Sequence, residues 1–221
     1  MAYIIDGRSA QLGHAIEAKT KAIRVVDCPR GTGYALSGTS GSVAAAAAAG
    51  GCFFAMRINP SSTNILTFVE RVRLQFTTIT AFTTSITAGR RLSLYRGTGA
   101  ATTGGTQMQP VNVDTSGAVS QVNTATGGDS RIASTATLGV TGITWEAYPI
   151  REMALVHLGA AGYQGNDENV FDFSASAPII LQAGQVLGIR NPQAMDAGGV
   201  WQISVDIAFH ESVAWSSQNL D

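Results

Sequence analysis

Residues 201–210, Trp-Gln-Ile-Ser-Val-Asp-Ile-Ala-Phe-His, alternate large apolar side chains with small or polar ones without a break. Successive side chains of a β-strand point to opposite faces of a sheet, so the apolar residues of this stretch share one face. A slip of one residue in the pairing would expose all of them, which fixes the register. We therefore predict a long strand with one buried face.

A second long strand is predicted upstream, over residues 66–77. Glu70 interrupts its apolar alternation, which points to a β-bulge at that residue. The apolar face is predicted to consist of Leu66, Phe68, Val72, Leu74 and Phe76. Shorter strand-like runs, separated by turn residues, cover residues 52–58, 143–148, 153–158, 170–173, 179–182 and 185–190.

The composition favours the same fold class. The chain of 221 residues has 25 Gly and only 13% charged residues, and it contains 22 Thr, a residue that suits strands. Such a low charge, with 45% hydrophobic residues, excludes a chain that is disordered throughout. Strands joined by turns without crossover helices pair in antiparallel fashion. We predict an all-β fold, an antiparallel jelly-roll-like β-sandwich with an extended N-terminal arm.

The first 50 residues differ from the rest. The stretch from Gly38 to Gly51 contains six consecutive alanines, Ala44–Ala49, a run too short for a stable isolated helix. We interpret it as a linker or a thin segment threaded along a surface. The predicted division is therefore an N-terminal arm and Gly/Ala-rich linker over residues 1–50, and a jelly-roll β-sandwich domain over 51–221. Within that domain, residues 97–130 are predicted to be a long loop, of a length that is often functional or mobile.

Charge is distributed unevenly along the chain. Residues 1–96 hold 11 Lys+Arg and 4 Asp+Glu, whereas residues 97–221 hold 3 and 11. Arg71 and Arg73 share a predicted strand face, with Arg90 and Arg91 nearby, yet no aromatic ladder accompanies them as in a single-strand nucleic-acid binder. We expect no direct nucleic-acid binding. These arginines are expected to face the acidic half of the same or a neighbouring subunit.

The sequence contains no recognisable catalytic, metal-binding or phosphate-binding motif. The histidines, His14, His157 and His210, form no metal-binding pattern, and no GxSxG or phosphate-binding glycine motif occurs. We expect no catalytic residue, no cofactor, no metal and no enzymatic activity. No apolar run is long enough to span a membrane, and no signal peptide is visible. Whether Cys28 and Cys52 pair stays open.

The aromatic residues allow a second interpretation. Trp145, Tyr148, Tyr163 and Trp215 could form a platform for sugars, but Trp145 is in phase with Ile143, which favours packing in the core. Trp215 is a candidate interface anchor.

Three stretches resemble parts of known virion proteins. They are Gly89–Gly99, Pro178–Arg190 and Gly199–Glu211. Together they resemble the strands of small jelly-roll structural proteins of tailed bacteriophages, of the head-decoration (cement) or appendage kind. The resemblance covers roughly residues 52–211 and is one of pattern, without a diagnostic motif.

This resemblance implies a function without catalysis. It implies a homotrimer on the virion, assembled in the host cytoplasm, which decorates or cements a phage capsid by binding adjacent subunits of the major capsid protein or another virion protein. Residues 1–50 would be an arm over neighbouring subunits. The partner-binding residues would be Arg8, Lys19, Lys21, Arg24, Arg30 and Trp215. The alternative is a carbohydrate- or receptor-binding fibre or appendage module; an enzyme on a jelly-roll scaffold is a third interpretation.

Overall fold

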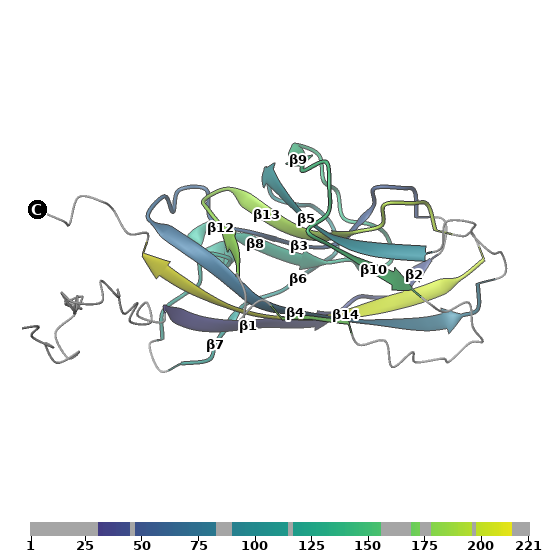
Figure 1. Ribbon diagram of the computed structural model, residues 1–221, viewed down its shortest axis with the longest axis horizontal. Coiled ribbons are helices and arrows are strands. Elements are labelled where there is room, and N and C mark those ends of the chain that lie inside the picture. Colours follow the sequence, from purple (N-terminus) through teal and green to yellow (C-terminus); the bar gives the residue numbers. More distant parts are fainter. Residues whose placement is uncertain are drawn as a thin grey trace, which may run out of the picture. The chain divides into compact units, whose positions relative to one another are not determined.

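Two antiparallel sheets pack face to face in the computed structural model (Figure 1). The structure describes residues 31–44, 47–82, 90–114, 117–155, 169–172, 178–195 and 198–213. Sheet I has the strand order β11-β4-β14-β1-β7, with β12 beside β4 and β2 beside β14. Sheet II has the order β10-β5-β13-β3-β8-β6, with β9 beside β5. The chain crosses between the sheets repeatedly, as jelly-roll connections do, and the predicted all-β sandwich is confirmed.

Nearly every predicted strand is present in the structure. Sheet I consists of β1 (Thr32–Thr39), β2 (Val43–Ala44), β4 (Ile65–Thr80), β7 (Val111–Asn112), β11 (Asn169–Asp172), β12 (Ile179–Leu181) and β14 (Val200–Val213). Sheet II consists of β3 (Cys52–Arg57), β5 (Arg90–Gly99), β6 (Thr106–Gln107), β8 (Asp129–Ile132), β9 (Ile143–Trp145), β10 (Arg151–Leu155) and β13 (Gln185–Arg190). A single turn of 3-10 helix, Thr124–Thr126, is the one helical element of the described residues.

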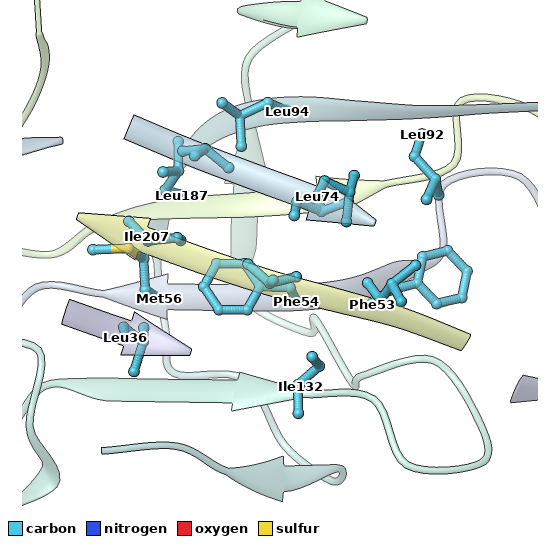
Figure 2. Packing of buried hydrophobic residues seen from close by; sticks show 14 of the residues in the cluster. Leu36, Phe53, Phe54, Met56, Leu74, Leu92, Leu94, Ile132, Leu187 and Ile207 are labelled. Atoms are coloured by element: carbon cyan, nitrogen blue, oxygen red, sulfur yellow. The ribbon is translucent and has the colours of Figure 1, made fainter. Parts of the chain in front are cut away.

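The core lies between the two sheets, where side chains from both layers meet (Figure 2). The predicted alternation of β14 is confirmed, because every second residue from Trp201 to Phe209 is buried. Trp201 is at the centre of an aromatic group: its ring lies 4.6 Å from that of Phe53 and 5.2 Å from that of Phe76. These contacts join β14 of sheet I to β3 of sheet II.

The predicted β-bulge at Glu70 is confirmed, but two of the five residues predicted for the apolar face, Leu66 and Phe68, lie on the opposite face. In the pairing of β4 with β14, Arg71 lies opposite Ala208 and Val69 opposite Phe209, so Glu70 has no counterpart. The extra residue turns Thr67 and Val69 inward and Phe68 outward. The prediction that Leu66 and Phe68 share the core face was therefore wrong, because the bulge shifts the alternation by one residue.

The sheet takes in residues that the sequence analysis assigned to the arm. All eight residues of β1 pair with β14, from Thr32 opposite Glu211 to Thr39 opposite Ser204. Tyr34 and Leu36 of β1 are buried in the core. The compact unit of the chain begins at Gly31, not at residue 51 as predicted. Residues 1–30, the remainder of the predicted arm, lie outside the described residues.

Residues 47–51 lie against Asn191, the residue that follows β13 of sheet II. The side chain of Asn191, which is fully buried, donates hydrogen bonds to the carbonyls of Ala47 and Ala48 at 3.3 and 3.0 Å. The backbone of Asn191 bonds on both sides, to the N–H of Gly50 at 2.7 Å and to the carbonyl of Gly51 at 3.1 Å. Of the two interpretations, a free linker and a segment threaded along a surface, the second describes residues 47–51.

Candidate interaction surface

The outer face of sheet II is closed by the chain itself. Residues 138–145 fold back over it, with Leu138 bonded to the carbonyl of Cys52 at 2.8 Å and β9 paired with the end of β5 (Figure 1). Leu138 and Trp145 pack there with Cys52, Ala55 and Val186 in a second apolar cluster, separate from the main core. This explains why β3 is buried along nearly its whole length, on both faces.

Two features hold Trp145 in this cluster. A Cβ on Gly188 would lie 2.5 Å from the Trp145 ring, so the glycine makes room for the indole. The guanidinium of Arg190 lies 4.7 Å from the Trp145 ring centre and 5.1 Å from that of Tyr95, and it donates to the carbonyl of Gly50 at 2.8 Å. The preference for packing over sugar binding is confirmed for Trp145, although in this second cluster rather than in the main core.

The outer face of sheet I has no such cover among the described residues. Its side chains can be placed in rows from the strand register, because residues directly opposite one another in a sheet point to the same side. The first row runs from the Val113 side chain over Gly33 to His210, Phe68 and Ile180. The rings of Phe68 and His210 stack at 4.8 Å, 5° from parallel.

The second row has small side chains at its centre, so the surface is flat there. It joins Val111, Ala35, Ala208, Arg71 and Asp172. Two alanines lie between an exposed valine and an Arg-Asp pair of neighbours, so a partner can approach the backbone closely there.

The remaining rows form a polar depression of about 460 Å³. Ser37, Asp206 and Arg73 make up one row, and Thr39, Ser204 and Gln75 the next. The hollow arises because β1 and β14 carry short side chains here, whereas β4 carries the long Arg73 and Gln75. The hydroxyls of Thr39 and Ser204 are 2.8 Å apart. Over about 20 Å, the face therefore changes from apolar and aromatic to polar.

The exposed apolar residues gather on this face. Three of the seven large hydrophobic side chains exposed among the described residues belong to it: Val111, Val113 and Ile180. Val111 and Val113 are each 64% exposed. Such a gathering on one face is typical of an interaction surface rather than of scattered surface residues.

The edge of this face is held by a buried carboxylate. Glu211 accepts hydrogen bonds from the Ser120 hydroxyl at 2.7 Å and from the Gln121 N–H at 2.9 and 3.0 Å. The Tyr34 hydroxyl donates to the carbonyl of Ala118 at 3.2 Å. Burial raises the pKa of Glu211 above its ordinary value despite these bonds. The predicted loop of residues 97–130 is thus bonded to sheet I and itself contributes the short strands β6 and β7.

The two oppositely charged halves of the chain meet within one molecule. Arg91 pairs with Glu152 at 3.1 Å and Arg96 with Glu146 at 2.6 Å, both on sheet II. On the open face of sheet I, Arg71 lies 3.9 Å from Asp206. This confirms the expected pairing of N-terminal arginines with the acidic half of the same subunit. The pairs are half exposed, so each contributes about 0–1 kcal/mol.

The predicted arginine group is not assembled as one patch. Arg71 and Arg73 do share the outer face of β4. However, Arg90 is buried under the ring of Phe82, 4.0 Å from its centre, and Arg91 lies on the other sheet.

The predicted partner-binding residues lie outside the described residues. These are Arg8, Lys19, Lys21, Arg24, Arg30 and Trp215. His14, Cys28, His157 and Tyr163 lie there too. Of the other aromatic candidates, Tyr148 is 83% exposed on a turn. Cys52 is a free thiol with no exposed surface, and burial raises its pKa to about 12.

The sequence analysis did not predict the first row, in which Phe68 and His210 lie side by side. His210 was recognised as part of a polar face, but its partners were not: its Nδ1 lies 3.0 Å from Glu70, and Phe68 stacks on its ring. The available signal was the bulge itself. A bulge at Glu70 implies that residues before it change face, which turns Phe68 outward.

Among the described residues, no three His, Cys, Asp or Glu side chains are grouped to hold a metal ion. No helix in the described part is long and apolar enough to cross a membrane. Neither a protein-family model nor a curated protein matches the sequence.

Proposed function

We propose that this chain is a non-enzymatic virion structural protein that binds neighbouring protein subunits through the open face of sheet I. The observation that carries the proposal is that the outer face of sheet II is covered by the chain, whereas the outer face of sheet I has no such cover among the described residues. Sheet II buries its outer apolar residues under residues 138–145, whereas on sheet I Val113 and Ile180 are exposed and Phe68 between them is only partly buried. Exposed apolar area of this kind gains most from contact with another protein.

The charge of the face fits a protein partner. Arg71, Asp206 and Asp172 lie side by side, so the face has no strong field of one sign. Little charge must be desolvated when such a surface is covered. This also fits the resemblance to decoration and cement proteins, whose partner would be the major capsid protein or another virion protein.

Several copies would act together. A homotrimer would present three such faces, and linkage of weak contacts raises the overall affinity well above that of one face. The basic residues of the N-terminal segment, Arg8, Lys19, Lys21, Arg24 and Arg30, would add contacts to an acidic surface of a neighbouring subunit.

The test is co-sedimentation with capsids of the encoding virus that lack this chain, together with the mass in solution. Ala208→Arg places a long cation in the flat centre of the open face and is expected to weaken docking at least about ten-fold, because an unpaired charge must be desolvated. Tyr148→Arg, on an exposed turn outside the face, is the matched control and should dock like the wild type. Equal docking of all three would overturn the role of the face, and absence of wild-type docking would overturn the function.

The polar depression favours one alternative function, a carbohydrate-binding module. Hydroxyls, an amide and both signs of charge line it, a set that can bond to sugar hydroxyls. A glycan array with the wild-type chain separates this alternative from the first proposal.

A further inference from the structure

The outer edge of β1 is covered along only part of its length. β7 pairs with Tyr34 and Ala35 and then ends, whereas β1 continues to Thr39 (Figure 1). No described strand runs beside Ser37, Gly38 and Thr39 on that side. Ser37 and Thr39 are exposed, and all three residues line the polar depression.

The backbone groups on this edge can be assigned by alternation. Ser40 donates to the carbonyl of Ile203 in β14 at 2.8 Å, so even-numbered residues of β1 bond toward β14. On the other side, Gly33 accepts from Val113 at 3.0 Å and donates to Asp114 at 3.0 Å. The N–H and C=O of Ser37 and Thr39 therefore point away from β14, past the end of β7.

We infer that an extended polypeptide segment of the partner adds to this edge as a strand, opposite Ser37–Thr39. Exposed edges are templates for strand addition, and main-chain hydrogen bonds supply the affinity in that mode. A saccharide has no regular repeat of donors and acceptors at strand spacing, and no aromatic ring lines the depression to stack on a sugar. The inference rests on the proposed function only for the source of the segment.

The side chains beside the edge predict what kind of segment fits. Residues opposite Ser37 and Thr39 would face outward over the depression, next to the rows that hold Asp206, Arg73 and Gln75. They are expected to be polar. The residue between them, opposite Gly38, would point inward to where Met108 lies against Gly38, and is expected to be small or apolar.

The experiment pans the full chain against displayed random nonapeptides and measures the affinity of the enriched synthetic peptides by fluorescence anisotropy. Ser37→Pro removes an edge N–H that does not bond to β14, a place where sheets tolerate proline. It is expected to weaken binding at least about ten-fold. Ser37→Ala keeps the backbone donor and should stay within about three-fold of the wild type.

A second measurement protects the test against a misfolded variant. Methylation of alternate peptide amides removes ladder donors without changing the protein, and one of the two methylation patterns should weaken binding at least about ten-fold. The inference is overturned if no peptide enriches, if neither Ser37→Pro nor methylation matters, or if a glycan binds and is lost in Arg73→Ala but not in Ser37→Pro. Failure of capsid docking with the peptide result intact would overturn the proposed function alone.

Discussion

The outer faces of the two sheets differ in how far their apolar side chains are buried. On sheet II, the apolar side chains of Cys52, Ala55 and Val186 lie under Leu138 and Trp145 of a returning segment. On sheet I, comparable side chains such as Val111 and Ile180 stay exposed. Among the described residues, a long loop thus covers the outer face of sheet II and none covers that of sheet I. Both faces belong to the same low-charge chain, so low charge alone does not explain the exposed apolar residues of sheet I. This difference is the basis of the proposal that the open face binds a partner.

The largest expected effect concerns β1, which forms the floor of the open face. A chain beginning at residue 51 lacks β1 and β2 and is expected not to fold, because β14 keeps only β4 as a partner and the core loses Tyr34 and Leu36. A chain beginning at residue 31 is expected to keep a cooperative transition. Circular dichroism on heating measures both, and a folded chain beginning at residue 51 would contradict the placement of β1.

The next effect compares one aromatic residue from each face. Trp145→Ala should lower the free energy of unfolding by about 2–4 kcal/mol, because it empties the cluster over sheet II. Phe68→Ala should lower it by about 1 kcal/mol or less, since the ring contacts solvent and His210 on the open face. Urea unfolding of both variants gives the values. Equal losses would show that the two faces do not differ in cover.

A smaller effect is expected for two substitutions, one on each sheet, that enlarge a side chain instead of truncating it. Gly188→Ala should cost about 1–3 kcal/mol, because its methyl group would meet the Trp145 ring at 2.5 Å. Ala208→Ser, on the open face, should change the stability by no more than about 0.5 kcal/mol. Thermal unfolding of both chains checks the pair. A neutral Gly188→Ala would mean that residues 138–145 are not packed tightly on sheet II.

The smallest effect depends on pH. Burial raises the pKa of Glu211 above its ordinary 4.5, so the folded state holds this proton more tightly than the unfolded state. Stability from that proton is full below pH 4.5 and is lost as the pH rises through the folded-state pKa. Relative to Glu211→Gln, the wild type should lose stability over that window. Unfolding midpoints measured from pH 4 to 8 test it, and a difference that does not vary with pH would contradict the burial of a charged carboxylate.

Much of the fold could be predicted from local patterns. The alternation from Trp201 to Phe209 and the bulge at Glu70 are visible because strand periodicity is a property of neighbouring residues. The boundary was misplaced because β1 has small residues, Gly33, Ala35 and Gly38, whose strand character comes from pairing with β14. The cover of sheet II was not predictable either: it depends on a glycine at 188 meeting a tryptophan 43 positions earlier, which no local pattern records.

The open face itself could be predicted only in part. The polar side of β14 was evident, but the row from Val113 to Ile180 combines the residue after β7 with residues of β1, β14, β4 and β12. Only the register brings those residues together, and register between distant strands is a tertiary property.

The most direct test of the central claim is hydroxyl-radical footprinting of the chain, free and docked on the phage capsids that we propose as its partner. The account predicts that Phe68, His210 and Val113 lose reactivity on docking, whereas Tyr148 keeps it. Protection of Tyr148 with unchanged reactivity at Phe68 and His210 would contradict the assignment of the open face of sheet I as the docking surface.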